Sequence, residues 1–265
     1  MNIIYFSNST LPSKEANAVH VVQMAEAFTE SGHDVTLWGH KGSLDDVENI
    51  YESYNISKKV VIKFYEKFSF KGSSTLASIN ALWFAYRRKT DLIIGRDAKI
   101  CALASLFGFK VIFETHQPVS FFPFFERLLL ILAIRFKRFK KIVTISKFLQ
   151  DVLCNENHIR KDYVQVLNDG AIEAKNIKPL KFDSKNKIHI GYFGHLHRGR
   201  GIDIIVELAK LLPEIDFHLV GGNDKDVAFW KKSTNKQNNI FFHGFFNYRQ
   251  ASQYRLSCDI LLSPY

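Results

Sequence analysis

Short apolar runs alternate with longer amphipathic stretches along most of this chain. The runs have the length and branched apolar content of strands buried in a parallel sheet. The predicted strands of the first two-thirds are Asn2–Ser7, Asp34–Trp38, Val60–Tyr65, Asp91–Gly95, Phe109–Glu114, Lys141–Ile145 and Tyr163–Leu167. The predicted helices are Asn17–Ser31, with Asn17 as its cap, Thr75–Arg88, Ala98–Phe107, Phe122–Phe139 and Lys147–Asn155. This alternation predicts an α/β fold with a doubly wound parallel sheet.

The alternation lapses in a polar, lysine-rich segment and restarts at Lys187. Further strands are predicted at 188–193, 217–220, 239–242 and 259–262, with helices at 202–212, 226–232 and 250–256. We therefore predict two Rossmann-like domains, 1–175 and 187–265, joined by a linker at 176–186. Ligands of such sheets bind beyond the carboxyl ends of the strands, so we expect the polar groups there to surround one cleft between the domains.

The turn from Gly194 to Gly201 combines three glycines with His195, Arg198 and Arg200, and a helix follows it directly. Its glycine spacing fits neither the dinucleotide fingerprint nor a Walker A loop. Glycine lets the backbone approach an anion, and a helix N-terminus offers free N–H groups with partial positive charge. Together with the arginines, these features favour a phosphate site over an ordinary turn.

The chain carries a net charge of +10, which favours a negatively charged partner. Its three scattered cysteines predict neither a disulfide framework nor a zinc site, and the amino terminus lacks the pattern of a signal peptide. We therefore expect a cytoplasmic protein, and we predict no cofactor. No nucleic-acid-binding motif accompanies the charge, so nucleic acid is not expected as a partner.

The segment 121–141 has two interpretations. It is strongly apolar up to Ile134 and then rich in lysine and arginine. One interpretation is a packed helix followed by a solvated basic turn. The other, which we favour, is a patch at which the protein attaches peripherally to anionic lipid on the inner face of the plasma membrane, each basic residue contributing roughly 1 kcal/mol.

Several stretches together resemble the family-4 retaining glycosyltransferases. They are NAVHVVQMAEAFTESGHDVTL, DLIIGRD, VIFETH, IVTISKFLQDVL, VQVLNDGAI, GYFGHLHRGRGIDIIVELAKLLPEIDFHLVGG, NIFFHGFF and CDILLSPY. The resemblance covers nearly the whole chain. It implies the two-domain GT-B architecture, a nucleotide-diphosphate sugar as donor, a glycan or lipid-linked acceptor, and no required metal.

The resemblance also implies roles for particular residues. It implies that Arg200 binds the diphosphate. His195 occupies a position where the family commonly has an arginine, and Arg198 can substitute for that arginine. His116 matches a histidine near the transferred sugar, and its alternative role is a strand-end histidine bonded to backbone. The donor-binding set is Gly194, His195, Arg198, Arg200, Gly201, Gly221, Gly244 and Phe245, the last against the base. Arg96 and His20 are weaker substrate-binding candidates, by position, and Arg96-Asp97 is read more simply as an ion pair or a helix cap.

The family's Glu-x7-Glu motif and closing helix would lie beyond Tyr265. We therefore expect a truncated chain with an incomplete second domain. Two functions of different class follow. One is a glycosyltransferase, in bacterial surface polysaccharide synthesis. The other is a catalytically inactive, membrane-associated nucleotide-binding fragment.

Overall fold

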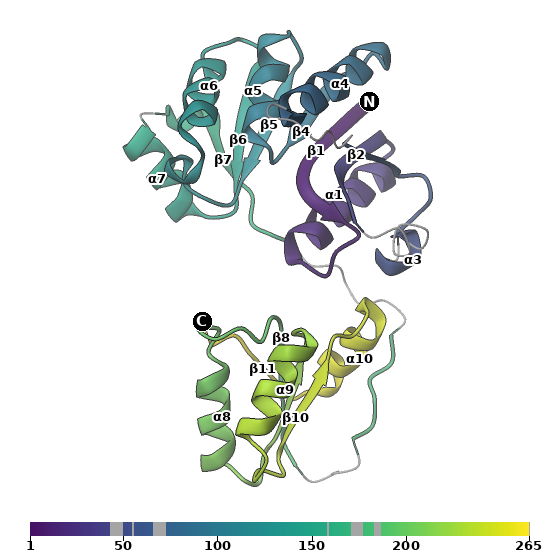
Figure 1. The fold of residues 1–265 in the computed structure, drawn as a ribbon, viewed down its shortest axis with the longest axis vertical. Coiled ribbons are helices and arrows are strands. Elements are labelled where there is room, and N and C mark those ends of the chain that lie inside the picture. The colour runs from purple at the N-terminus through teal and green to yellow at the C-terminus, as the bar shows by residue number, and fades with distance from the viewer. Residues whose placement is uncertain are drawn as a thin grey trace. The chain divides into compact units, whose positions relative to one another are not determined.

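The computed structural model describes residues 1–42, 50–54, 56–65, 73–157, 159–170, 177–182 and 187–264. The chain divides into two compact units, Met1–Gly170 and Ala171–Tyr265, each built on its own sheet (Figure 1). Of the predicted linker, residues 176 and 183–186 lie outside the described residues. The described part packs within the second unit, where the backbone N–H of Leu180 donates to Ser257 Oγ at 2.7 Å.

A seven-stranded parallel sheet forms the centre of the first unit. Its order is β3 (Val61–Phe64), β2 (Asp34–Lys41), β1 (Asn2–Leu11), β4 (Leu92–Gly95), β5 (Val111–Thr115), β6 (Phe139–Thr144) and β7 (Val164–Val166). The long strand β1 lies inside the sheet and pairs on both sides, so that Ile3 is level with Val35 and with Leu92. Its central residues are apolar because both faces are covered.

Helices cover both faces of this sheet (Figure 1). They are α1 (Ala16–Glu30), α3 (Ile50–Tyr54), α4 (Ser73–Arg87), α5 (Ala98–Leu106), α6 (Phe124–Ile134) and α7 (Lys147–Asn157), with short 3-10 turns at Val119–Phe121 and Lys161–Tyr163. Side chains alternate along β1. Ile3 and Tyr5 join the core under α1, whereas Ile4 and Phe6 join the core under α4 to α7. The doubly wound arrangement expected from the sequence is therefore confirmed.

The second unit has a four-stranded parallel sheet of the order β10 (Ile240–Gly244), β9 (Asp216–Val220), β8 (His189–Phe193) and β11 (Ile260–Leu262). Its helices are α8 (Ile202–Leu211), α9 (Asp224–Ser233) and α10 (Tyr248–Ser257). A separate apolar core includes Tyr192, Ile205, Phe217 and Trp230. This is again the predicted Rossmann-like arrangement, in a smaller sheet.

Two local predictions are wrong. The helix expected at Phe122–Phe139 ends at Ile134, and β6 already begins at Phe139. Phe139 is buried and pairs with Val111, so it belongs to the sheet core rather than to the helical apolar face. Asn17 does not cap α1, because the cap position is Glu15, whose side chain makes no capping hydrogen bond.

Both sheets have a topological switch point, where the chain runs to one side of a strand and later to the other. In the first sheet the switch lies between β1 and β4, and in the second it lies between β8 and β11. Open α/β sheets bind ligands in the crevice beyond the carboxyl ends of strands at such points. These two edges are therefore the places to look for function.

Candidate functional site

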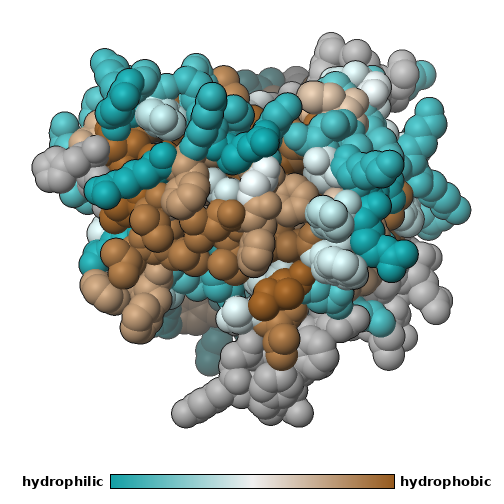
Figure 2. All heavy atoms as spheres, turned by 90° about the horizontal axis from the view of Figure 1, so that it is seen from above, coloured by the Kyte–Doolittle hydropathy of each residue, from teal (hydrophilic) through white to brown (hydrophobic). Residues whose placement is uncertain are grey.

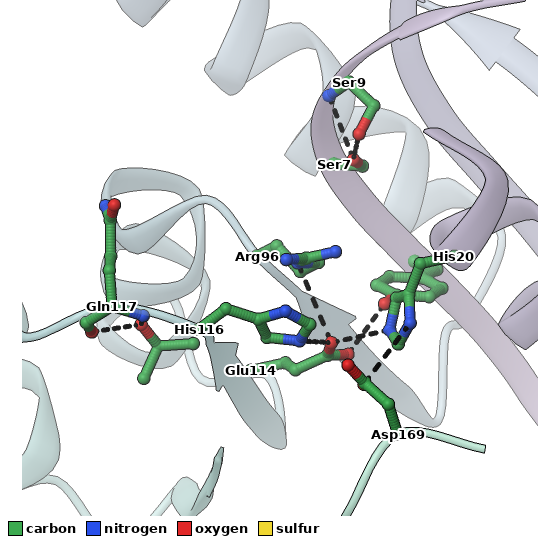
Figure 3. Close-up of polar contacts among 10 residues, drawn as sticks. Ser7, Ser9, His20, Arg96, Glu114, His116, Gln117 and Asp169 are labelled. Atoms are coloured by element: carbon green, nitrogen blue, oxygen red, sulfur yellow. Dashed lines mark hydrogen bonds and ion pairs between the residues drawn. The ribbon is translucent and has the colours of Figure 1, made fainter. Parts of the chain in front are cut away.

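Glu114, at the end of β5, is the centre of a polar cluster in the first unit (Figure 3). Its Oε1 lies 2.8 Å from His20 Nε2 and 2.8 Å from His116 Nε2, and its Oε2 accepts a hydrogen bond of 2.7 Å from the Tyr5 hydroxyl. Arg96 Nε is 3.7 Å from Oε1. The cluster unites residues from β1, α1, the end of β4 and the end of β5.

The protonation of this cluster follows from its hydrogen bonds. Burial by itself raises the pKa of Glu114, but the hydrogen bonds from His116, His20 and Tyr5 outweigh it and hold this pKa well below the usual range. An ionised carboxylate only accepts hydrogen bonds, so both Nε2 atoms must carry protons. The other ring nitrogen of His116, Nδ1, has no hydrogen bond to a described residue, so in the neutral ring it can accept one from a ligand.

A pocket of about 380 Å³ opens beside this cluster. The carboxyl ends of β1, β4 and β5 and the start of α6 line it, with Ser7, Asn8, Arg96, Glu114, His116 and Glu126 among the polar side chains. Arg96 Nη1 is buried and has no hydrogen-bond partner among the described residues. Glu126 has a raised pKa, first because of burial and then because of nearby Asp97. The pocket therefore offers both donors and acceptors to a polar ligand.

Asp169, which follows β7, approaches the same cluster, with Oδ1 3.6 Å from His20 Nδ1. His20, His116 and Asp169 can each bring one ligand atom within 4.8 Å of the others, so a metal ion could be held there. The sequence prediction was that no metal is needed, and the function proposed below does not use one.

In the second unit, the turn between β8 and α8 is built mainly from backbone. Gly199 and Gly201 have φ values of 83° and 71°, a left-handed conformation that glycine adopts without strain. The Tyr192 hydroxyl donates to the His195 carbonyl at 2.7 Å, and Trp230 Nε1 donates to the Leu196 carbonyl at 2.8 Å. The turn is thus fixed in place ahead of the N-terminus of α8, where backbone N–H groups are available to an anion.

The cationic side chains of this turn differ in their surroundings. The Arg198 guanidinium lies over the Phe229 ring, 4.4 Å from its centroid. The rings of His195 and His197 stack at 5.0 Å, and His197 Nδ1 lies 3.2 Å from Asp226. Arg200 is exposed and follows Gly199 at the mouth of the turn. Arg198 is therefore committed to an aromatic contact that the sequence did not predict.

Gly221 follows β9 and Gly244 ends β10, both beside this turn. Gly221 N donates to the Gly244 carbonyl at 2.7 Å, and a Cβ on Gly221 would meet the Gly194 carbonyl oxygen at 2.1 Å. Phe245 follows Gly244 and is half exposed, at 47%. The predicted donor-binding residues of the second unit thus lie along one edge of its sheet, the carboxyl ends of its strands.

The structure also brings together the predicted site residues of the first unit, His20, Arg96 and His116. Asp97 is the helix cap that the sequence allowed, since its side chain accepts from Ile100 N at 2.8 Å. Sequence reasoning missed Glu114 and Tyr5 as members of the site. The available signal for Glu114 was an acid at the end of an apolar strand, directly before Thr115-His116.

Comparison with known proteins identifies the family and the fold of this chain. Residues 18–171 match the family Glycosyltransferase Family 4, so the chain belongs to that family. The match and the fold define a GT-B glycosyltransferase, that is, a sugar-transferring protein. A search of curated proteins finds no match.

Solved structures with the same fold cover nearly all of this chain. HepE from Anabaena, solved with UDP and glucose, has a TM-score of 0.68 and 18% identity, over 98% of this chain and 73% of its own. A Rickettsia africae glycosyltransferase has a TM-score of 0.69 and 15% identity, over 99% and 73%. The UDP-GlcNAc 2-epimerase from Neisseria meningitidis has a TM-score of 0.63 and 12% identity, over 98% and 76%. At these identities the likeness establishes the fold.

Proposed function

We propose that this protein transfers a sugar from a nucleotide-diphosphate sugar to a hydroxyl of a glycan or lipid-linked acceptor, with retention of the anomeric configuration. The observation that carries the proposal is the fixed glycine turn of residues 194–201 at the switch point of the second sheet. Such a turn fits a diphosphate, which is also the leaving group of the reaction. Synthesis of a surface polysaccharide is the setting we propose.

The donor diphosphate binds at this turn in our proposal. Negative charge grows on the leaving phosphate as the glycosidic bond breaks, and fixed N–H donors and cations stabilise that charge. Arg200 and the N-terminus of α8 fill this role, while Gly194, Gly201 and Gly221 let the backbone come close. His195, Arg198 and Gly244 border the diphosphate, and Phe245 contacts the base.

The acceptor end of the reaction lies at the pocket of the first unit. There Glu114 accepts a hydrogen bond from Nε2 of His116, so that Nδ1 of the same ring can accept a hydrogen bond from a sugar hydroxyl. Arg96 supplies an unsatisfied donor at the same pocket, and His20 acts through Glu114. His116 is thus the group that we place next to the reacting sugar.

Peripheral membrane association is a further part of the proposal. The structure describes no helix that is both long and apolar enough to cross a membrane. In α6, however, Phe124, Phe125, Leu128 and Leu132 are all exposed, between 47% and 79%. Exposed basic residues follow at 135, 137, 138, 140 and 141. Apolar side chains beside cations suit the interface of an anionic membrane.

Donor binding tests the proposal without knowledge of the acceptor. Calorimetry with UDP and uridine, and then with other nucleotide pairs, should find a diphosphate that binds. Arg200→Ala should weaken diphosphate binding about 10- to 150-fold, the value of a charge-assisted hydrogen bond of roughly 1.5–3 kcal/mol, and leave nucleoside binding nearly unchanged. Arg198→Ala, whose guanidinium lies on Phe229, is the matched control and should cost less.

Transfer is then measured as nucleotide release and as the anomeric configuration of the product. His116→Ala should lower turnover while donor affinity stays. Equal loss of diphosphate and nucleoside binding in Arg200→Ala would contradict the phosphate role. Donor binding without transfer to any glycan or lipid-linked acceptor would favour the binding fragment instead.

A further inference from the structure

Two neighbouring hollows of opposite chemistry lie in the first unit, away from the site described above. They are formed by the end of α4, the end of α5 with residues 107–110, and Arg138 before β6. Tyr86, Phe107 and Phe109 line both hollows and form the wall between them. These segments precede β4, β5 and β6, so the hollows lie at the amino ends of the strands, opposite to the polar pocket.

The first hollow is an apolar slot of about 350 Å³. Ile79, Leu82 and Trp83 line it together with the three shared aromatic residues. Trp83 and Tyr86 are 59% and 68% exposed, and their rings stack at 5.8 Å. Phe107, 66% exposed, lines the same slot. Large aromatic side chains that gather on a surface indicate a binding site for another apolar molecule.

The second hollow, of about 590 Å³, is cationic. Arg87, Lys89, Lys110 and Arg138 line it, and the only carboxylate among its lining residues is Asp91. Asp91 accepts a hydrogen bond from Asn2 N at 2.8 Å. All four cationic side chains are exposed, and none makes an ion pair with a described residue. The hollow thus has four positive charges against one negative charge.

We propose that this pair of hollows binds an anionic phospholipid. Its phosphate lies in the cationic hollow and an acyl chain lies in the aromatic slot. The shared wall of Tyr86, Phe107 and Phe109 then sits at the boundary between head group and chain, a position that suits tyrosine and other aromatic rings with one polar and one apolar environment. The surface is a lipid-binding site with two chemically distinct parts.

Charge complementarity favours a lipid over a protein as the occupant. Anionic lipid attracts every cation of the hollow at once, and the attraction falls off within a Debye length. Figure 2 views the end of the first unit at which β1 begins, and shows a hydrophobic area bordered by hydrophilic side chains. A free phosphate would use the cations but leave the aromatic slot exposed to water.

This site differs from the α6 surface proposed above for membrane contact. It shares Arg138 with the basic residues that follow α6 but otherwise uses α4 and the 107–110 loop, and it does not depend on sugar transfer. Trp83 provides a direct reporter, because the other tryptophans, Trp38 and Trp230, are only 6% and 8% exposed. Lipid binding in the slot must therefore change the fluorescence of Trp83 above all.

The test uses the whole chain with vesicles of phosphatidylcholine, with and without phosphatidylglycerol, at low salt. We expect binding only with phosphatidylglycerol, and quenching of Trp83 by brominated acyl chains. Lys89→Gln with Lys110→Gln, which leaves the basic residues after α6 intact, should weaken binding about 30-fold, from roughly 1 kcal/mol per cation. Lys225→Gln with Lys232→Gln, on exposed positions of the second unit, removes the same charge and should weaken it less than threefold.

The aromatic part is tested separately. Trp83→Ser should lower vesicle binding about tenfold, whereas Trp83→Phe should keep binding and lose the quenching. Soluble glycerol phosphate should not compete. Three results would each overturn the inference: no binding to phosphatidylglycerol vesicles, equal displacement by glycerol phosphate, or binding that leaves Trp83 unquenched and is lost in Phe124→Ser with Phe125→Ser, which would assign the contact to α6 alone.

Discussion

The two candidate sites occupy equivalent positions in their sheets but are built in different ways. In the first unit, side chains from four separate elements meet at Glu114, and their hydrogen bonds fix one another. In the second unit, glycine backbone forms the site. The buried side chains of Tyr192 and Trp230 fix it by donating hydrogen bonds to carbonyl groups of the turn. One site is a network of side chains, and the other is a shaped piece of main chain.

This difference predicts how each site responds to change. A network that contains a buried charge depends on every partner, because an unpaired charge or donor in a low-dielectric site is costly. A backbone site is insensitive to most side-chain changes but depends on the absence of a Cβ where chain segments touch. The second unit should therefore be vulnerable at particular glycines, and the first at Glu114.

The largest effect is expected from Glu114→Ala. This variant leaves the hydrogen-bond donors of His20, His116 and Tyr5 without their common acceptor, and should destabilise the first unit by about 3–5 kcal/mol. Tyr5→Phe removes only one of these bonds and should cost about 1–2 kcal/mol. Denaturant unfolding followed by hydrogen exchange would assign each loss to its unit.

Glu114→Gln tests function in the same network. It keeps the shape of the side chain but removes the charge that keeps both Nε2 atoms protonated. We expect sugar transfer to fall about 100-fold, from the loss of roughly 2–3 kcal/mol of charge-assisted hydrogen bonding, with donor affinity unchanged. Glu126→Gln, in the same pocket, is the control. Equal turnover in Glu114→Gln and wild type would mean that sugar transfer does not depend on the charge at the centre of this network.

Two glycines of the second unit test whether its site depends on the absence of a Cβ. Gly221 and Gly199 both have positive φ, 122° and 83°, but a Cβ at Gly221 meets the Gly194 carbonyl oxygen at 2.1 Å, whereas a Cβ at Gly199 meets nothing within 4 Å. Gly199→Ala should cost about 1 kcal/mol from backbone strain alone. Gly221→Ala should cost about 3 kcal/mol, because the strand end must also move. Similar losses in unfolding free energy would show that close contact is unimportant there.

The sequence predicted these two sites unequally, for a physical reason. The glycine turn is local, since Gly194 to Gly201 are neighbours in the chain, and its composition is visible without a fold. The Glu114 network joins residues up to 109 positions apart, and only the pairing of β1 with β4 and of β4 with β5 brings them together. The strands were predictable because each buried run is continuous. The end of α6 was not, because apolar Phe136 and Phe139 extend the helical pattern into the next strand.

The two units should also differ in their acid sensitivity. In the second unit, His189, His218 and His243 lie on adjacent strands, and His218 hydrogen-bonds to both neighbours at 3.1 Å. Burial, followed by the charges of His243 and His189, lowers the pKa of His218 to about 4. Burial and the charge of Lys231 lower the pKa of His243 to about 4, while nearby Asp216 opposes the shift at His218.

The sign follows from linkage. Above the ordinary histidine pKa of 6.5, both histidines are neutral in the folded and unfolded states, and stability is unaffected. Between pH 6.5 and 4 the unfolded chain binds protons that the folded unit does not, so stability falls as pH falls, by up to about 1.4 kcal/mol per pH unit for each histidine. Glu114 affects stability in a different pH range. Its pKa is lowered, so its contribution is complete above 4.5 and is lost only below that value.

Hydrogen exchange at pH 7, 6 and 5 should therefore show progressive loss of protection in β8 to β10, with little change in β1, β4 and β5. His218→Phe is the matched variant, because a phenyl ring can keep the stacking on Phe182 and Phe241, at 4.3 and 5.2 Å, and cannot titrate. It should reduce the pH slope of the second unit by up to half, although it also removes two hydrogen bonds and lowers stability at pH 7. A parallel loss of protection in both units from pH 7 to 5, unchanged in His218→Phe, would mean that the histidines are not the origin of the acid sensitivity.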